Sequence, residues 1–213
     1  MKIGFVGYGS MAAALAGKWV GKHELFVGGR NRDKAHTLAE TLGQGTKAGS
    51  EAEAVRFGDV VVLATRHENV FEAIEAAGGA NAFAGKTVID INNAVSSDTF
   101  LMQPMGGQSL AQAIQGRLPA ARIVKAFNMC QAKVWAMPEP VFDGRRLQVL
   151  MCGDNAGAKA MVGTLIRDVG CEPLDLGGLQ YAAHIEHAGA IVIKLLFGGR
   201  DPLTVLNLVD AAG

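Results

Sequence analysis

A short glycine-rich segment near the N-terminus has the residue types and spacing of a phosphate-binding turn. Residues 7–12 read Gly-Tyr-Gly-Ser-Met-Ala, directly after an apolar run and directly before a helical pattern. In this pattern the first glycine allows a tight turn, the second lets the backbone approach a pyrophosphate, and the alanine permits close packing of helix on strand. The free N–H groups at the helix start attract phosphates. The segment therefore predicts dinucleotide binding, against the plainer reading of a structural strand–helix turn.

The end of the next expected strand distinguishes between the two nicotinamide dinucleotides. An NAD site places Asp or Glu there to hold the ribose 2′-hydroxyl, but residues 26–32 read Phe-Val-Gly-Gly-Arg-Asn-Arg. The two glycines are expected to leave space, and Arg30 can donate paired hydrogen bonds to a 2′-phosphate. For Arg32 and Lys34 a solvated basic turn is the plainer interpretation. The strand end therefore predicts NADP.

Polar residues also follow three further expected strands. Residues 65–67 read Thr-Arg-His, residues 92–94 read Asn-Asn-Ala, and residues 128–130 read Asn-Met-Cys. Taken singly, the asparagines are ordinary turn residues and His67 is an ordinary exposed histidine. Because ligands of an open α/β sheet bind beyond the carboxyl ends of its strands, we expect these residues together to surround a nicotinamide pocket.

The elements that must position these residues alternate regularly along the chain. Several strand candidates are nearly continuous apolar runs, which is typical of strands covered on both faces. The alternation predicts an α/β fold, a Rossmann-like, doubly wound, mainly parallel sheet. Expected strands are 2–6, 24–27, 60–64, 87–91, 122–127, 147–151 and 172–176, and expected helices are 11–20, 32–42, 51–57, 70–77, 109–115 and 156–169.

The alternation stops after residue 176, and residues 179–197 predict one long, largely apolar helix. We therefore expect a Rossmann-like domain over 1–176 and a C-terminal helical addition over 177–213 on the acceptor side. His184 and His187 are expected to share a helix face, and two interpretations stay open: with the glutamate between them they rim the acceptor pocket, or they form a plain helix surface in water. Two histidines without a third ligand do not make a metal site, so no metal is expected. The C-terminal segments are apolar and should be buried against other protein surface, which predicts a homodimer.

Composition excludes several classes of protein. The 213 residues contain 20 basic and 20 acidic side chains, a balance unlike that of nucleic-acid-binding proteins. Three cysteines without a C-x-x-C pair suggest neither a disulfide framework nor a zinc site, and Cys152 and Cys171 are expected in the core. The apolar runs are too short for a secretory signal or a membrane span, so a cytoplasmic protein without membrane partners is expected. The 28 glycines are expected to mark turns and close backbone approaches.

Six motifs follow one another along the chain: GYGSMA, GGRNRDKA, VVVLATRHENV, KTVIDINNAV, VKAFNMC and GDNAGAKAMVGTLIRDVGCEPLDLG. Together they resemble the F420-dependent NADP reductase family, which includes the cytoplasmic reductase domain of the six-transmembrane metalloreductases. The resemblance runs from residue 1 to about residue 197 and implies NADP as cofactor and a dimeric assembly. With the glycine motif, it gives the expected cofactor-binding residues: Gly7, Tyr8, Gly9, Ser10, Met11, Ala12, Gly29, Arg30, Asn31, Lys34, Ala64, Thr65, Arg66, His67, Asn93, Ala126 and Asn128.

The chain departs from the family pattern at three places. Gly29 stands where relatives carry a small hydroxyl residue before the 2′-phosphate arginine. Arg66 and His67 stand where relatives carry proline and then an aromatic residue, and Ala94 replaces the proline of an Asn-Pro pair. Because of these departures, the resemblance does not identify the hydride acceptor.

The residues favour hydride transfer between cofactors. The chain has no Tyr-x-x-x-Lys pair and no obvious positioned acid of the kind that carbonyl reduction needs, whereas transfer to a flavin or deazaflavin mainly requires ring positioning. We therefore expect an NADP(H)-dependent oxidoreductase whose small-molecule acceptor is F420, FMN or FAD, with onward reduction of ferric chelates. Its catalytic residues stay unknown, and His67, His184 and His187 are the acceptor-pocket candidates. The alternatives are a non-catalytic NADP(H) sensor and a reductase of a small imine or carbonyl.

Overall fold

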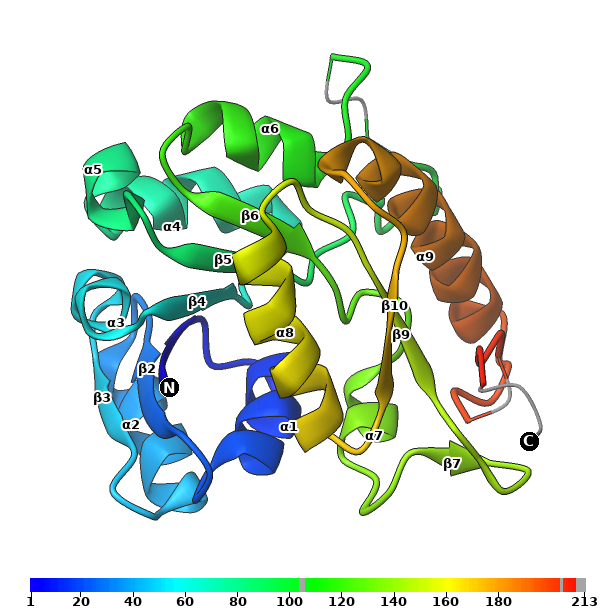
Figure 1. Ribbon diagram of the computed structural model, residues 1–213, viewed down its shortest axis with the longest axis horizontal. Helices are drawn as coiled ribbons and strands as arrows, with labels where there is room; N and C mark the ends of the chain where they lie inside the picture. Colours follow the sequence, from blue (N-terminus) through cyan, green and yellow to red (C-terminus); the bar gives the residue numbers. More distant parts are fainter. Residues whose placement is uncertain (104–105, 204, 210–213) are drawn as a thin grey trace.

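The computed structural model describes residues 1–103, 106–203 and 205–209 and is built on a six-stranded parallel sheet (Figure 1). The strand order is β3-β2-β1-β4-β5-β6. Successive strands are therefore added on one side of β1 up to β3, and on the other side of β1 from β4 onward, so the strand order reverses between β1 and β4. This order is that of doubly wound dinucleotide-binding folds and confirms the expected Rossmann-like fold class. The strands are β1 (Lys2–Val6), β2 (Glu24–Gly28), β3 (Lys47–Gly49), β4 (Val60–Leu63), β5 (Thr87–Asp90) and β6 (Arg122–Lys125).

Helices cover both faces of the sheet, which explains the continuous apolar runs of the strands. In β4, Val60 and Val62 pack into the core on one face, while Val61 and Leu63 pack into the core on the other. The first face is covered mainly by α1 (Ser10–Trp19) and α8 (Ala156–Asp168), with α2 (Arg32–Leu42) and α7 (Ala132–Trp135) beside them. The second is covered by α3 (Glu51–Phe57), α4 (Val70–Ala76), α5 (Gly79–Phe83) and α6 (Leu110–Arg117).

Local capping explains why two helices have the bounds that the sequence predicts. The Asn31 side chain accepts a hydrogen bond of 2.9 Å from the Lys34 N–H at the start of α2, and Gly43, with φ of 65°, ends that helix. Ser50 and Glu53 form a reciprocal capping box at the start of α3. Such caps satisfy N–H groups that a helix leaves unpaired and therefore define its first residue.

The last two expected strands form, but outside the main sheet. β9 (Gln148–Met151) and β10 (Glu172–Asp175) pair with each other in parallel, and a single bridge between Lys125 and Cys152 joins them to β6. The expected strand over 122–127 ends at Lys125, because the chain turns at Phe127, whose φ is 62°. The sequence prediction did not include β3, α5, α7 or the hairpin of β7 (Val141–Phe142) and β8 (Arg145–Arg146), all of which are short.

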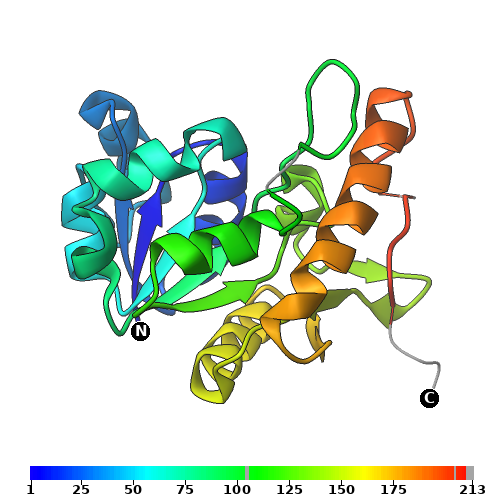
Figure 2. The same cartoon turned by 90° about the horizontal axis from the view of Figure 1, so that it is seen from above.

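The chain ends in the helix α9 (Ala182–Phe197), preceded by a 3₁₀ turn at Leu179–Tyr181, close to the expected single helix. Figures 1 and 2 both show α9 at the opposite end of the molecule from α2 and α3. Its first half packs into the core, with Ala182 and Ile185 almost completely buried. No helix in the described ranges is long and apolar enough to cross a membrane. The division of the chain at residue 177 stays a prediction.

Candidate nucleotide-binding site

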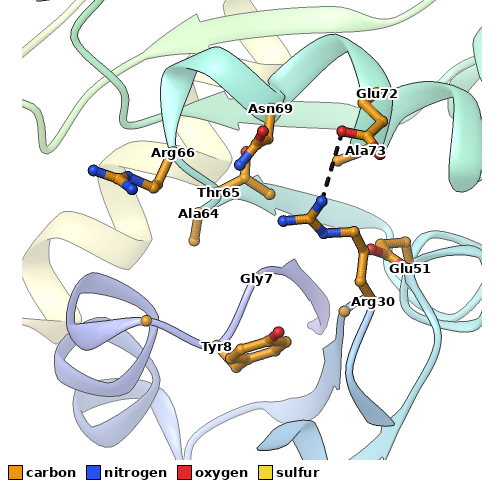
Figure 3. A pocket seen from close by; sticks show the side chains of 12 residues that line it. Gly7, Tyr8, Arg30, Glu51, Ala64, Thr65, Arg66, Asn69, Glu72 and Ala73 are labelled. Carbon is orange, nitrogen blue, oxygen red and sulfur yellow. Dashed lines mark ion pairs between the residues drawn. The ribbon is translucent and has the colours of Figure 1, made fainter.

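A cavity of about 210 Å³ lies at the carboxyl edge of the sheet, where β1, β2 and β4 end (Figure 3). This is the point at which the strand order reverses, the usual ligand site of an open α/β sheet. Its walls come from the glycine turn, the residues after β2 and β4, and the start of α4. The lining residues are Gly7, Tyr8, Gly9, Gly29, Arg30, Glu51, Ala64, Thr65, Arg66, Asn69, Glu72 and Ala73.

The two glycines of the turn have different physical roles. Gly7 has φ of 122°, and a Cβ there would lie 2.3 Å from the carbonyl oxygen of Ala64, so only glycine allows these two strand ends to approach. A Cβ on Gly9, in contrast, would point into open space within the described structure. Gly9 is also the N-cap of α1 without any capping side chain, unlike the caps of α2, α3, α6 and α8. The start of α1 is thus open to a phosphate.

The glycines after β2 do not leave empty space beside Arg30, which corrects the sequence prediction. A Cβ on Gly28 would lie 2.4 Å from the carbonyl oxygen of Ser50, so this glycine lets α3 approach the strand. A Cβ on Gly29 would lie 2.3 Å from Cε1 of Tyr8. The Tyr8 ring therefore lies directly against Gly29, on the floor of the cavity in Figure 3.

Arg30 faces the cavity but is paired with an acidic side chain from the other wall. Its Nη1 lies 3.6 Å from Oε2 of Glu72, and both side chains are largely exposed. Arg32 pairs instead with Glu53 at 3.3 Å. Asn31 and Lys34, both expected to bind the cofactor, lie outside the lining of this cavity, and Asn31 caps α2. Of the basic residues after β2, the structure brings Arg30 to the cavity.

Two further cavities adjoin each other beyond β5 and β6. One, of about 430 Å³, is lined by Ser10, Met11, Ile91, Asn93, Phe127, Asn128, Met129, Cys130, Gln131, Ala132, Lys133, Val192, Ile193 and Leu196. The other, of about 280 Å³, is lined by Arg66, His67, Glu68, Ile91, Asn92, Asn93, Val95, Ser96, Ser97, Phe100, Ile193 and Phe197. Both linings include Asn93, so this residue borders a cavity that contains residues of the glycine-motif helix and one that contains His67, and α9 contributes to both.

Asn93 and Asn128 come from different strand ends and bind each other. The Asn128 Nδ2 group donates to Oδ1 of Asn93 at 2.8 Å, and the Asn93 Nδ2 group donates to the carbonyl of Asn128 at 2.8 Å. Asn128 Nδ2 also donates to the carbonyl of Ile185 in α9. A Cβ on Gly189 would lie 2.5 Å from Asn93 Oδ1, so a glycine in α9 lets the helix reach this pair.

Three buried polar atoms at this edge have no hydrogen-bond partner within the described structure: Thr65 Oγ1, His67 Nε2 and Asn128 Oδ1. Each belongs to one of the three cavities. An unpaired buried polar atom costs about 1–3 kcal/mol, so such atoms are uncommon unless a ligand or water pairs them. Together with the open glycine turn, they fit a polar ligand that extends along the sheet edge, as a dinucleotide does.

The structure does not form the predicted histidine and glutamate rim. His184 is exposed and packs against the ring of Tyr181, and His187 lines a separate apolar groove with Phe100 and Ile191. Glu186, between them in sequence, is completely buried on the opposite side of α9. His67 is the candidate histidine that lies at the cavities, with a side chain 10% exposed. No group of three or more potential metal ligands occurs among the residues that the structure describes.

A buried ion network that the sequence analysis missed lies behind the cavities. Lys125 Nζ is 2.8 Å from Oδ2 of Asp90 and 3.1 Å from Oε1 of Glu186, and all three side chains are 0% exposed. Burial alone would lower the pKa of Lys125, but the two carboxylates hold that pKa above its usual value. A charged residue at the end of each of the strands TVID and RIVK, Asp90 and Lys125, was the available sequence signal.

The remaining departures and cysteines have plain structural roles. Ala94 is completely buried, while the Arg66 side chain is 80% exposed and lies 4.0 Å from Glu68. Cys152 and Cys171 are core residues, as expected. Burial raises the pKa of Cys130, which lines a cavity, to about 12, so its thiol is protonated near neutral pH and is not a nucleophile there.

Comparison with known proteins gives the family context. Residues 2–94 match the model of the family NADP oxidoreductase, coenzyme F420-dependent. The metalloreductase STEAP3 of Rattus norvegicus is 34% identical over 208 residues, covering 97% of this chain and 39% of that protein. STEAP2 of Homo sapiens is 26% identical over 205 residues, covering 95% of this chain and 38% of that protein. The chain thus spans about two fifths of the length of the curated relatives it matches.

Solved structures show the same fold over most of the chain. A structure assigned as an F420-dependent NADP reductase of Arthrobacter sp. FB24 has a TM-score of 0.80 and 29% identity, covering 93% of this chain and 94% of that one. A reductive aminase of Aspergillus terreus in complex with NADPH has a TM-score of 0.67 and 21% identity, covering 93% and 62%, and shows the shared fold alone. The resemblance to the F420-dependent NADP reductases that the motifs predicted is confirmed.

Proposed function

We propose that this protein binds NADP(H) along the carboxyl edge of its sheet and transfers hydride between it and a flavin-like or deazaflavin acceptor. The observation that carries this proposal is the row of buried unpaired atoms, Thr65 Oγ1, His67 Nε2 and Asn128 Oδ1, beside the open glycine turn. The turn and the start of α1 would hold the pyrophosphate, and Arg30 the 2′-phosphate. Asn93 and Asn128 would hold the nicotinamide end.

NADPH supplies the hydride when bound, and the residues of this chain orient the reactants and exclude water. The reciprocal hydrogen bonds between Asn93 and Asn128 fix both side chains. Phe127 and Val192, both almost completely buried, form apolar wall in the cavity on one side of Asn93. His67, on the other side, lines the adjoining cavity with its Nε2 buried and unpaired in the described structure.

The cavity that contains His67 has walls suited to a planar ring. Phe100 and Phe197 lie at its mouth with ring centroids 5.0 Å apart, and Ile91 and Ile193 add apolar surface. Aromatic and aliphatic walls with a few polar groups are typical of sites for flat, partly polar ligands. This composition supports F420, FMN or FAD as the acceptor.

Turnover with a panel of acceptors tests the proposal. NADPH oxidation is followed by the loss of nicotinamide absorbance in the presence of F420, FMN, FAD, a ferric chelate or a cyclic imine. We expect consumption with a flavin or with F420, and ferric reduction only when one of them is present. Tight NADPH binding without consumption across the panel would establish the sensor alternative, and consumption with the imine alone would establish the imine reductase alternative.

Arg30 gives the most direct test of the cofactor assignment. A paired, charge-assisted contact is worth about 1.5–3 kcal/mol, so Arg30→Ala is expected to weaken NADPH binding by about 10- to 150-fold and to leave NADH binding nearly unchanged. Titration of intrinsic or nicotinamide fluorescence measures both affinities. Arg32→Ala is the matched control, because Arg32 pairs with Glu53 instead of lining the cavity. Equal losses for the two cofactors would disprove the 2′-phosphate assignment.

We also propose that a second copy of the chain covers the C-terminal apolar surface. Ile191 is 57% exposed, Phe197 is 73% exposed, and Leu206 is 55% exposed. Light scattering coupled to gel filtration should give a dimer, which Ile191→Lys should dissociate. A monomeric wild-type protein would contradict the homodimer.

A further inference from the structure

We propose that Glu72 weakens the preference of the nucleotide cavity for NADP(H) by competing with a 2′-phosphate for Arg30. Glu72 lies in the first turn of α4 and Arg30 follows β2, so the two side chains reach the cavity from opposite walls (Figure 3). Their charged groups are 3.6 Å apart. The inference rests on the proposed NADP(H) site and concerns a residue to which the cofactor assignment gives no role.

The ion pair with Glu72 engages the guanidinium that a 2′-phosphate would bind. The guanidinium of Arg30 is directed at Glu72 in Figure 3. A 2′-phosphate that takes paired hydrogen bonds from Arg30 must therefore displace Glu72 or share the guanidinium with it. In either case, binding the phosphate costs part of the existing attraction between Arg30 and Glu72.

The cavity lining has no excess of positive charge that would offset the carboxylate of Glu72. The lining contains two cationic side chains, Arg30 and Arg66, and two acidic ones, Glu51 and Glu72. Arg66 points away from Arg30 in Figure 3, with its side chain 80% exposed and Glu68 4.0 Å away. A phosphate dianion at Arg30 would thus lie close to the carboxylate of Glu72, which is 3.6 Å from that guanidinium.

The strength of the effect follows from the exposure of the pair. Arg30 is 60% exposed and Glu72 is 65% exposed, so water screens their attraction, and Glu72 lowers the affinity for the phosphate without blocking it. NAD(H) has a neutral 2′-hydroxyl and can bind with the Arg30–Glu72 pair intact. Removal of the Glu72 charge should therefore strengthen NADP(H) binding selectively.

The test is a set of equilibrium titrations of NADPH and NADH with the wild-type protein and Glu72→Gln. The range measured for exposed ion pairs corresponds to a gain of about 1.4- to 5-fold in NADPH affinity, with no change for NADH. Raising the NaCl concentration should reduce this gain, because salt screens exposed charges. The matched control is Glu75→Gln: Glu75 is in the same helix and pairs with Arg117 at 3.0 Å, away from the cavity lining, and this variant should bind NADPH like the wild type.

Several outcomes would overturn the inference. Unchanged or weaker NADPH binding by Glu72→Gln would show that Glu72 does not compete, or that it orients Arg30 for the phosphate. If Glu72→Gln increases NADPH affinity equally in the presence of Arg30→Ala, then Glu72 and the 2′-phosphate do not compete for Arg30. The same titrations separate this failure from that of the proposed function: if the wild type binds NADPH weakly and Arg30→Ala changes nothing, the NADP(H) site itself is wrong.

Discussion

The two ion networks beside the sheet edge have the same chemistry and opposite physical settings. Asp90, Lys125 and Glu186 are completely removed from water, with Lys125 2.8 Å and 3.1 Å from its two carboxylate partners. Arg30 and Glu72 are 3.6 Å apart and mostly in water. The first network is a fixed part of the fold, whereas the second is weak enough for a ligand to replace one partner. Burial, more than residue type, decides which task an ion pair can perform.

The buried network joins four elements of the fold. Lys125 in β6 also donates to the backbone carbonyl of Asn92, which follows β5. The carboxylate of Glu186 in α9 accepts hydrogen bonds of 2.9 Å and 3.1 Å from the N–H groups of Leu110 and Ala111, at the start of α6. The negative charge of Glu186 thus caps a helix whose N-terminus favours an anion. This network holds α9 against the sheet and therefore holds Gly189 against Asn93.

Loss of Lys125 should have the largest effect on stability. Lys125→Met leaves two buried carboxylates without their cation, and breaking a buried ion pair in this way costs about 3–5 kcal/mol. Urea denaturation followed by circular dichroism measures the free energy of unfolding. The control is Lys22→Met, because Lys22 is 52% exposed beside Asp168 and should contribute less than about 1 kcal/mol. A loss for Lys125→Met no larger than that of the control would contradict the contrast between the networks.

Replacing Glu186 should have a smaller effect. Glu186→Gln keeps the shape and one acceptor oxygen but removes a charge and leaves a backbone N–H at the start of α6 without its acceptor. A loss of about 1–3 kcal/mol in unfolding free energy is expected. Hydrogen exchange of α6 and α9 should rise together in this variant. Faster exchange confined to α9 would show that Glu186 does not couple the two helices.

The buried network should also make the folding stability of the wild type depend on pH in the alkaline range. Because the pKa of Lys125 is raised in the folded protein, its contribution is fully present below the unfolded lysine pKa of about 10.4 and is lost as pH rises towards the folded pKa. The slope from this one group is at most about 1.4 kcal/mol per pH unit. The difference in unfolding free energy between wild type and Lys125→Met, measured from pH 9 upward, should therefore shrink above about pH 10.4. A constant difference would contradict the shifted pKa.

The exposed pair should matter least for stability. Glu72→Gln is expected to change the unfolding free energy by less than about 1 kcal/mol, and any change should disappear at high salt. The same denaturation curves measure it. A loss comparable to that of Lys125→Met would mean that the pair between α4 and β2 supports the fold and is not free to serve a ligand.

The predictions from sequence succeeded where the determining contacts are local. The bounds of α2 and α3 follow from caps that lie within a few residues, such as Asn31 with Lys34 and Ser50 with Glu53. The glycine turn was recognisable for the same reason. β3 has only three residues, Lys47–Gly49, none of a type with a high β preference, so its pairing with β2 left no local pattern to detect.

The amino-acid sequence was enough to predict the doubly wound fold, to find the glycine turn before α1, and to show an arginine where an NAD site would carry an acid. Each of these depends on residue types at short spacing. The tertiary structure alone decided that the Tyr8 ring lies against Gly29, that Glu72 faces Arg30, and that Glu186 turns away from the histidines beside it. These contacts join segments far apart in the chain. Their geometry, and the burial that makes one ion pair fixed and the other replaceable, exist only after the sheet and helices pack.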